Sequence, residues 1–459
     1  MKFAKYIFFV IALIAISCED KLELQPAQSL ATEESLSDVK GMLTALYGAY
    51  DMLQDLNIYG RDYIVMAELE ADLVYLSLSN SNRYVQNYTF LWTPDNANIT
   101  AVWNDYYTVI LRCNNIINNI DKIEGDAAEK NQIKGEALAI RALSHFDLVR
   151  VFAKQYTQSN PTADLGVPVV LESKIDEPTR NTIAEVYNQI TSDLEATKGL
   201  LTDKGKFRFG PDAANALLSR VYLYKGDYAN AEKFASDVIN TNKYAIADDI
   251  IAAFKAPGSS EEIFTLKFTA SETRGSDNLG RFFNPSGYGD ARVATDCISL
   301  YEPSDKRLGF IYKHTNNQMY TNKFFAQDGV DGLFSPKILR ISEMYLTRAE
   351  ARAKQNKFAD AIADLNAIRA KRSASALAGI ADADVFQTVL DERRRELAFE
   401  GHTKFDLWRN GLDMVRNQCN TGIELDAPCN LAASSNLRVY PIPTREIDVN
   451  QNMVQNSGY

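Results

Sequence analysis

The sequence contains little of what metal and cofactor sites are made from. It has 3 histidines and 5 cysteines among 459 residues, and none of them shows the paired Cys/His spacing of a zinc site. It also has no G-x-S-x-G motif, no Walker-type glycine loop and no dinucleotide-binding fingerprint. The sequence therefore predicts no metal site, no cofactor, and no nucleophilic or phosphate-transfer chemistry.

Clusters of basic residues and long apolar runs are missing as well. The chain has 49 Lys and Arg against 60 Asp and Glu, a formal net charge of -11. Nucleic acids and anionic lipid surfaces attract concentrated positive charge, so we expect no nucleic-acid partner. After the N-terminal apolar run, no segment approaches the roughly 18 consecutive apolar residues that suggest a membrane-spanning helix.

The chain opens with MKFAKYIFFVIALIAISCEDKLELQP, which has the three parts of a secretory signal. Lys2 and Lys5 are cationic, a small residue precedes Cys18, and the apolar run between them is too short for the about 20 residues that span a bilayer. A cysteine at the first mature position resembles the lipobox of bacterial lipoproteins, in which the thiol is acylated. We therefore expect a signal peptide at 1–17, a lipid anchor on Cys18, and a polar tether over 18–35.

From residue 36 onward the dominant pattern is helical. Apolar residues recur at intervals of three and four in several long segments: DVKGMLTALYGAYDML, AVWNDYYTVILRCNNIINNIDKI, KGEALAIRALSHFDLVRVFAKQY and TIAEVYNQITSDLEATKGLL. On the apolar faces of these segments we expect Cys113, Trp103, Tyr106 and His145 to be packing residues. The sequence predicts a fold dominated by α-helices, with most of the first half built from helix pairs.

Two later segments repeat one another. ALLSRVYLYKGDYANAEKFASDVI at 216–239 and LTRAEARAKQNKFADAIADLNAI at 346–368 align without a gap, and each reads as helix, tight turn, helix. Ala231 and Ala361 occupy matching positions where small residues allow close packing, as in a tetratricopeptide unit of about 34 residues. Tyr222 stands where that repeat has an aromatic residue, whereas Arg352 occupies the matching position in the second copy. We infer a helical-repeat scaffold with large insertions.

The insertions are irregular and carry the candidate working surface. Residues 245–338 are rich in Gly, Pro, Ser, Asn and aromatics, and two shorter irregular stretches lie near 72–100 and 415–440. Binding residues tend to lie on such loops, held by a rigid scaffold. Within the last stretch, Cys419 and Cys429 flank CNTGIELDAPC, which either closes as a disulfide loop or leaves two unpaired thiols.

Four segments together resemble a known family. In order along the chain they are KGEALAIRALSHFDLVRVF followed by LGVPVV, ILRISEMYLTRAEARAK, ERRRELAFEGHTKFDLWRNG, and the terminal YPIPTREIDVNQNMVQNSGY. They are similar to the signature stretches of the SusD/RagB family of outer-membrane nutrient-binding lipoproteins. One departure is Thr403, where the family commonly has Arg; Asp406 would then pair with Lys404 or Arg409.

The resemblance implies a single SusD-like domain over 36–459, in which tetratricopeptide-like helix pairs support a loop-rich, ligand-facing half. It also implies a protein that captures glycans, or sometimes peptides, performs no chemistry, and delivers its ligand to a SusC-like TonB-dependent transporter barrel. The chain would be anchored to the outer membrane and face the cell exterior. The alternative of a different class is a tetratricopeptide-like lipoprotein that scaffolds other envelope proteins.

Glycan binding requires flat apolar faces beside hydroxyl-bonding side chains. The segments YLSLSNSNRYVQNYTFLW at 75–92 and NLGRFFNPSGYGDAR at 278–292 offer that mixture in loop-like sequence. The candidate ligand-binding residues are Tyr75, Arg83, Tyr84, Phe283, Tyr288, Asp290 and Arg292. For each aromatic residue the alternative is a place in the core or in a cross-strand pair.

Two acidic patterns have both a functional and a structural interpretation. Glu392, Glu396 and Glu400 recur four residues apart with arginines between them, which suits an ion-pair lattice far better than the paired carboxylates of a glycosidase. Asp328 and Asp331 in DGVDG lack the ligand ladder of a calcium loop, so we expect a glycine turn there. Neither pattern predicts an enzyme.

Overall fold

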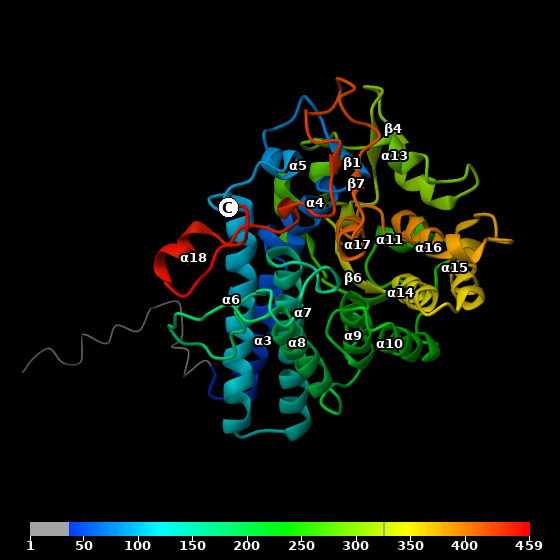
Figure 1. Ribbon diagram of the computed structural model, residues 1–459. Helices are drawn as coiled ribbons and strands as arrows, with labels where there is room; N and C mark the ends of the chain where they lie inside the picture. The colour runs from blue at the N-terminus through cyan, green and yellow to red at the C-terminus, as the bar shows by residue number, and fades with distance from the viewer. Residues whose placement is uncertain (1–35, 325) are drawn as a thin grey trace, which may run out of the picture.

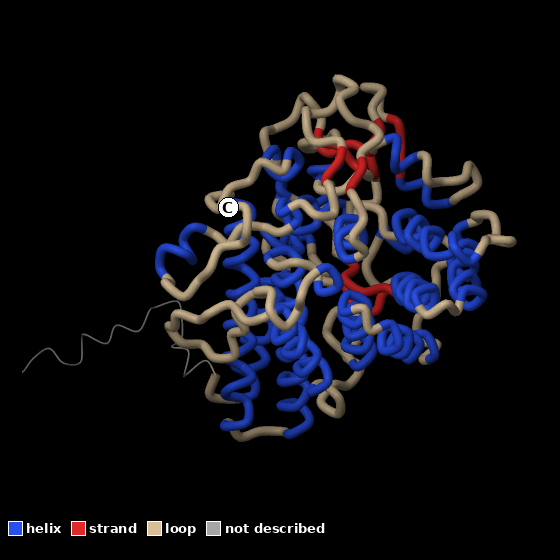
Figure 2. The backbone as a smooth tube through the Cα atoms, viewed as in Figure 1, coloured by secondary structure: helices blue, strands red, loops and turns tan. Residues whose placement is uncertain are grey.

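The computed structural model describes residues 36–324 and 326–459. The predicted signal peptide at 1–17, Cys18 and the tether at 18–35 lie outside them. Helices dominate the described chain, as expected (Figures 1 and 2). The longer helices are α3 (Val39–Leu53), α4 (Asp62–Leu69), α6 (Ala97–Asn119), α7 (Ala127–Phe152), α8 (Ile183–Ala196), α9 (Pro211–Lys225), α10 (Tyr228–Asn240), α14 (Ile341–Lys354), α15 (Phe358–Arg372), α16 (Asp382–Glu396) and α17 (Thr403–Arg409).

The helices α3, α6, α7 and α8 form one block, on the lower left of Figure 1. The aspartate and asparagine that precede α7 and α6, Asp126 and Asn96, cap them by accepting backbone N–H groups. From residue 132 onward, almost every side chain of α7 is buried, so this helix is the centre of the block. Arg141 joins α7 to α8 through two hydrogen bonds to the Asp193 carboxylate, at 2.7 and 2.8 Å.

The two repeated segments fold as predicted. Helices α9 and α10 form the first helix–turn–helix unit, α14 and α15 form the second, and α10 packs against α14. Gly226 and Asn356 make the matching turns with φ of 74° and 60°. Ala231 is fully buried, and its carbonyl accepts a 3.1 Å hydrogen bond from Ser219. Small side chains in both units therefore allow the close approach that the sequence indicated.

The aromatic position of the repeat differs between the units, as its sequence does. In the first unit the rings of Tyr222 and Phe234 stack, with centroids 5.5 Å apart. In the second unit Arg352 instead makes ion pairs of 3.0 Å with Glu232 and 2.8 Å with Asp364. Ionic contacts thus replace ring stacking, and the Glu232 pair links the second unit to the first.

The strands of the described chain are short and form four antiparallel pairs. The pairs are β1 (Val74–Leu76) with β3 (Ala291–Val293), β2 (Glu262–Thr265) with β6 (Lys337–Arg340), β4 (Ile311–Lys313) with β5 (Met319–Thr321), and β7 (Met414–Val415) with β8 (Asn430–Leu431). Short helices lie between them: α5 (Val85–Thr89), α11 (Ile250–Lys255), α12 (Leu279–Phe283), α13 (Thr295–Ile298) and α18 (Thr444–Val449). In Figure 1 β1, β4 and β7 lie at the end opposite the α6–α7 connection.

A buried ionic network joins the loop-rich half to the repeat units. Glu396 contacts Arg340 at 2.6 Å and Arg372 at 2.8 Å, and Arg372 also contacts Glu261 at 2.5 Å, with every side chain at most 1% exposed. Burial by itself raises the pKa of Glu396, but the two guanidinium groups outweigh it and hold that pKa well below its usual range. The expected ion pairs are present, but the arginines that contact Glu396 belong to other elements, whereas Arg393 and Arg394 contact Asp406 and Asp72.

Of the two partners that the sequence suggested for Asp406, only one is observed. Asp406 contacts Arg409 at 2.7 Å and, in addition, Arg393 at 2.7 Å. Lys404 is not a partner, because its ammonium group contacts Glu70 at 2.6 Å. The sequence could not show the Arg393 contact because it depends on how α16 and α17 are placed.

The membrane and packing expectations both concern the helices of the described chain. Within 36–324 and 326–459, no helix is both long enough and apolar enough to cross a membrane. Trp103, Tyr106 and Cys113 are buried on α6, at 2%, 0% and 0% exposure, as expected. His145 is fully buried, and burial lowers its pKa to about 3, which keeps the ring neutral.

Candidate functional site

The pairing of β1 with β3 brings the two candidate ligand-binding segments together. Tyr75 lies opposite Arg292 in this antiparallel ladder, and Val74 lies opposite Val293. Just beyond the strands, the Ser77 amide donates a 2.9 Å hydrogen bond to the Asp290 carbonyl. Segments that are distant in the sequence therefore lie side by side.

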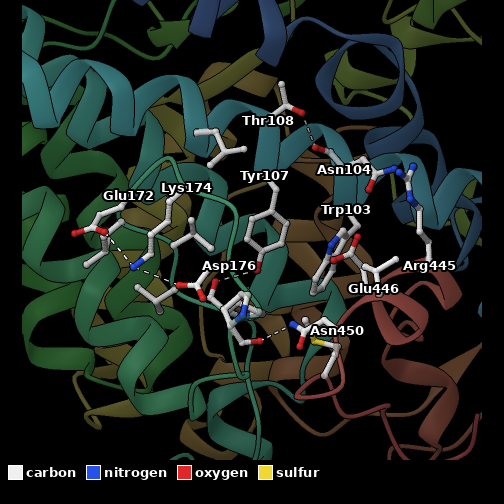
Figure 3. Close-up of a pocket in the computed structure, with 18 residues that line it drawn as sticks. Trp103, Asn104, Tyr107, Thr108, Glu172, Lys174, Asp176, Arg445, Glu446 and Asn450 are labelled. Atoms are coloured by element: carbon white, nitrogen blue, oxygen red, sulfur yellow. Dashed lines mark hydrogen bonds and ion pairs between the residues drawn. The ribbon is translucent and has the colours of Figure 1, made fainter.

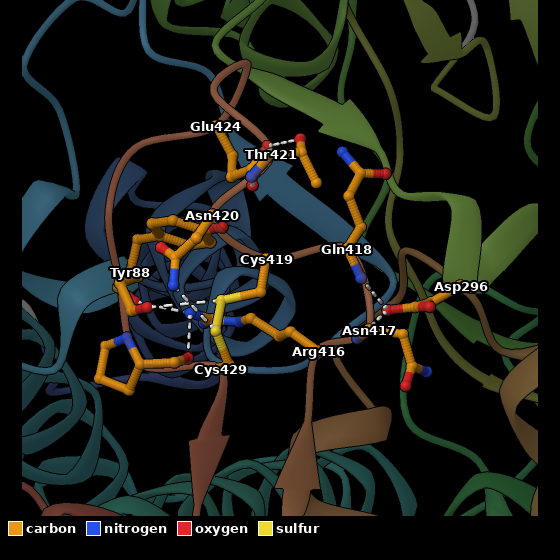
Figure 4. The surroundings of a disulfide bond; sticks show 12 residues. Tyr88, Asp296, Arg416, Asn417, Gln418, Cys419, Asn420, Thr421, Glu424 and Cys429 are labelled. Atoms are coloured by element: carbon orange, nitrogen blue, oxygen red, sulfur yellow. Dashed lines mark hydrogen bonds between the residues drawn. A yellow bond between two sulfur atoms is a disulfide. The ribbon is translucent and has the colours of Figure 1, made fainter.

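A third segment adds to this pairing and is closed by a disulfide. Cys419 and Cys429 are bonded, with Cα atoms 5.5 Å apart, so the bridged alternative is confirmed (Figure 4). The loop that they close pairs with the end of β1: the Leu78 amide donates to the Ile423 carbonyl at 3.0 Å, and the Leu425 amide donates to the Leu76 carbonyl at 2.8 Å. We call residues 74–84, 278–293 and 414–431 together the loop end.

A buried arginine holds the disulfide loop onto the scaffold. The Arg416 guanidinium lies 4.2 Å from the Tyr88 ring centroid and donates to the carbonyl oxygens of Leu69 and Ala71 at 2.7 and 3.1 Å. Figure 4 shows this side chain beneath the disulfide. The disulfide loop is thus held by its pairing with β1 and by the contacts of Arg416, which suits a binding surface that must keep its shape.

The structure buries four of the predicted ligand-binding residues. Tyr75, Tyr84, Phe283 and Asp290 are between 1% and 4% exposed. Phe283 packs on Phe324 with ring centroids 5.0 Å apart, and Asp290 accepts 3.1 Å hydrogen bonds from the Ser81 amide. A ring with so little exposed surface offers no face to a sugar, so the burial favours the core alternative for the three aromatic residues.

Two other predicted residues form a partly exposed pair at the loop end. The Arg83 guanidinium lies 3.9 Å from the centroid of the Tyr288 ring and donates a 2.8 Å hydrogen bond to its hydroxyl. The remaining predicted residue, Arg292, is also partly exposed, and its guanidinium lies 5.9 Å from the Tyr320 ring centroid. The loop end thus presents an aromatic ring and two cationic side chains, a combination that can bind hydroxyl groups and ring faces.

Two exposed apolar residues beside β1 are functional candidates that the sequence analysis missed. Leu78 is 60% exposed and Ile423 is 43% exposed, and their backbones share a hydrogen bond. Neighbouring Ser79 and Thr421 are exposed and polar. The sequence carries no signal for this pair, because only the disulfide loop's pairing with β1 brings them together.

A large cavity lies elsewhere, in a groove between α6, residues 168–178 and α18 (Figure 3). Its volume is about 890 Å³. Figure 3 shows the Tyr107 ring in the middle of the groove, with Lys174 bridging Glu172 and Asp176 at 3.2 and 3.3 Å on one side. Across the groove, burial raises the pKa of Glu446. No predicted ligand-binding residue lines it.

The described residues contain no group of three or more His, Cys, Asp or Glu side chains arranged to hold a metal ion. In the DGVDG segment Asp328 adopts a positive φ of 53° in a short turn. The Asp331 carboxylate accepts a 2.6 Å hydrogen bond from Ser286. The segment is therefore a turn whose second carboxylate is engaged by the protein itself.

Two family models match the chain. One, described as "Starch-binding associating with outer membrane", matches residues 21–223, and the other, described as "SusD family", matches residues 215–459. The SusD-like protein P2 of Formosa agariphila is 25% identical over the full length of both chains. The starch-binding protein SusD of Bacteroides thetaiotaomicron is 34% identical over 183 residues, which is 40% of this chain and 31% of that protein.

Solved structures show the same fold. A crystal structure of a Bacteroides vulgatus protein matches with a TM-score of 0.86 and 32% identity, covering 93% of this chain and 99% of that one. A SusD superfamily protein of Bacteroides thetaiotaomicron matches with a TM-score of 0.83 and 28% identity, covering 91% and 99%. The architecture of helix pairs with a loop-rich half is thus shared over nearly the whole chain.

Proposed function

The chain belongs to the SusD family, and we propose that it is a lipid-anchored, outward-facing protein of the outer membrane that captures glycans and delivers them to a partner TonB-dependent transporter. The observation that carries this proposal is the loop end. Three segments from distant parts of the chain meet there on a rigid helical scaffold. They present the Arg83–Tyr288 pair together with exposed Leu78 and Ile423.

The chemistry of this surface suits a sugar. The Arg83 guanidinium covers one face of the partly exposed Tyr288 ring and holds its hydroxyl in place, so the C–H side of a pyranose would stack on the opposite face. Exposed Ser79 and Thr421 supply hydroxyl groups nearby. The groups are pre-arranged by the strand pairing and the disulfide, so little conformational entropy is lost when a ligand binds.

Tyr288→Ala should weaken binding of the cognate oligosaccharide by roughly 5- to 150-fold, because a ring platform contributes about 1 to 3 kcal/mol. The melting temperature should stay close to that of the parent, because Tyr288 is only partly buried. Isothermal titration with a ligand from an oligosaccharide panel, together with a thermal melt, measures both effects.

Two control variants sharpen this test. Tyr47 on α3 is 49% exposed and has the Arg208 guanidinium 5.5 Å from its ring centroid, so Tyr47→Ala removes a similar pair away from the loop end and should leave affinity unchanged. Phe283→Ala should instead lower the melting temperature, because Phe283 is 1% exposed. If Tyr288→Ala binds the oligosaccharide as tightly as the parent does, the binding site does not include the Arg83–Tyr288 pair.

Capture of peptides by the same fold is the closest alternative, and an envelope scaffold that binds no small molecule is the second. A panel containing both oligosaccharides and peptides separates these functions by which class, if any, gives saturable binding. SusD family proteins are binding proteins, and incubation of a bound glycan should produce no new reducing ends. New reducing ends would show catalysis.

Removal of the predicted lipid anchor should release the protein from the membrane. In Cys18→Ser the acylated thiol is absent, so the chain should be recovered in the aqueous fraction or as an unprocessed precursor. Several acyl chains hold a protein stably, whereas one holds it only marginally. Fractionation followed by mass determination measures the outcome, and a processed variant that remained on the membrane would contradict the anchor.

The transporter should co-purify with this protein. A tethered binding protein cannot carry a ligand through a bilayer by itself, and the described residues contain no helix able to cross one. Gentle detergent extraction with cross-linking should therefore recover a large β-barrel protein. Recovery of the monomer alone under those conditions would count against delivery to a transporter.

A further inference from the structure

A second polar cavity lies on the side of the molecule where the C-terminal segment meets α17. It is bounded by residues 154–165, by Trp408 of α17, and by residues 433–439 and 454–457, and its volume is about 400 Å³. It shares no lining residue with the groove beside α6 or with the loop end. We call it the Arg438 cavity.

Two arginines in its wall have no acidic partner among the described residues. Arg438 and Arg180 are each 6% exposed. Arg438 donates only to backbone carbonyls, including that of Leu431 at 3.2 Å, and Arg180 does the same, with 2.7 Å to Gly166 and 2.9 Å to Val454. Burial lowers the pKa of Arg180 to about 10. Both guanidinium groups thus carry a desolvated charge that a carboxylate would stabilise.

The same wall contains buried polar atoms without hydrogen-bond partners. They are Nε and Nη1 of Arg438, Nε1 of Trp408 and Oε1 of Gln155. Three of these four atoms are donors. These donors have almost no accessible surface, so a negatively charged group in the cavity would stabilise them through its field rather than by direct hydrogen bonds.

The cavity is positively charged in a protein whose formal net charge is -11. The side chains of Lys154 and Asp164 also line it, but they contact one another at 3.1 Å and their charges offset. Asp413 lies near Arg438 and offsets part of its charge, but it does not line the cavity. The lining residues therefore keep a net positive charge from Arg180 and Arg438, and low-dielectric walls focus its field into the cavity.

The rest of the lining is rich in hydroxyl and amide groups, among them Gln158, Ser434, Ser435 and Asn456. We propose that the Arg438 cavity binds an acidic sugar of about one ring, with its carboxylate directed toward Arg438 and Trp408 and its hydroxyls toward the amides. A cavity of about 400 Å³ falls within the roughly 300 to 1,000 Å³ of small-molecule sites. The buried guanidinium groups act on the carboxylate chiefly through their field. This second site does not depend on glycan capture at the loop end.

The test uses the full-length chain purified in mild detergent, with sodium D-glucuronate, D-glucose and sodium sulfate as probes. The parent should bind glucuronate saturably in calorimetric titration. It should bind glucose and sulfate at least about 10-fold more weakly, because each lacks one of the two features that the cavity recognises. Absence of glucuronate binding, or equal affinity for glucose or for sulfate, would overturn the proposal.

Three variants locate the binding. Arg438→Met should weaken glucuronate binding by about 10-fold or more. Ser434→Trp places a large side chain at an exposed position in the cavity wall, so it should also weaken glucuronate binding by about 10-fold or more. Its melting temperature should stay close to that of the parent, so it tests the site even where Arg438→Met does not fold. Tyr288→Ala should bind glucuronate like the parent. Parent-like affinity in Ser434→Trp, or loss of glucuronate binding in Tyr288→Ala alone, would contradict a site in this cavity.

Discussion

Glu396→Ala should lower the free energy of unfolding by about 3 to 5 kcal/mol, because it removes one partner from a buried set of opposite charges. Glu396 contacts Arg340 at 2.6 Å, Arg372 at 2.8 Å and Arg307 at 3.1 Å. All of these side chains are at most 2% exposed. In the variant three guanidinium groups stay buried with less negative charge around them, and water cannot reach them without opening the core.

Chemical denaturation of parent and variant measures this loss. A surface pair serves as the matched control: Asp248 and Lys371 contact one another at 2.6 Å, but their side chains are 85% and 44% exposed. Asp248→Ala should therefore lower the free energy of unfolding far less than Glu396→Ala does, because water and salt screen an exposed pair. A Glu396→Ala variant as stable as the Asp248→Ala variant would show that the arginines find other partners or water, and that the network contributes little.

The sequence predicted the scaffold well because its signals are local. Apolar spacing of three and four residues marks each long helix, and the matching positions of Ala231 and Ala361 reveal the two repeat units. The acidic pattern that contains Glu396 indicated ion pairs, but the arginines that contact Glu396 come from β6, α15 and residues 306–310 rather than from between the glutamates. The helix spacing and the repeat depend on residues close together in the chain, whereas the contacts of Glu396 do not.

The loop end was predictable only in part, because its geometry depends on contacts between distant segments. Composition marked the segment 278–292 as a candidate for binding, but it could not distinguish the partly exposed Tyr288 from the buried Phe283 in that segment. That difference arises because Phe283 faces Phe324, a residue of another loop. Likewise the exposed Leu78 acquires Ile423 as a neighbour only through the disulfide-closed loop.

The groove beside α6 shows the same limit. Helical spacing placed Trp103 in the core, and the residue is indeed 2% exposed. The same helix also carries Tyr107, whose hydroxyl donates a 2.9 Å hydrogen bond to the Pro168 carbonyl. The groove exists because residues 168–178 and α18 stand on either side of α6 without closing over Tyr107. The local sequence of α6 carries no signal that predicts the distance between residues 168–178 and α18.

Glu68 should make stability depend on pH in a direction opposite to that of most carboxylates. This residue of α4 is fully buried, and burial raises its pKa to about 8, against a usual value of 4.5. One carboxyl oxygen accepts a 2.6 Å hydrogen bond from the Gly401 amide, and the other has no hydrogen-bond partner. The nearby Lys323 ammonium contacts Glu400 at 2.7 Å rather than Glu68. The folded chain therefore holds a proton on Glu68 at neutral pH.

Between pH 4.5 and about 8 the unfolded chain has lost this proton and the folded chain has kept it. Unfolding then releases a proton, so this group's contribution to stability falls as the pH rises, by about 1.4 kcal/mol per pH unit. Glu68→Gln removes the titration but keeps an oxygen acceptor for the Gly401 amide. Relative to the parent, the variant should gain on the order of 3 kcal/mol in unfolding free energy between pH 5 and pH 8.

Denaturation of both proteins across this pH range isolates the effect, because the other titrating groups cancel in the difference. Glu392→Gln is the control with the opposite sign. Burial alone would raise the pKa of Glu392, but Arg307, Arg395 and Arg369 lower it, so its contribution is present near neutral pH and is lost only as the pH falls below about 4.5. Between pH 5 and pH 8 the difference between parent and Glu392→Gln should therefore stay nearly constant. A difference between parent and Glu68→Gln that is equally constant would mean that Glu68 is ionised in the folded protein, held by the Gly401 amide and the Lys323 charge despite its burial.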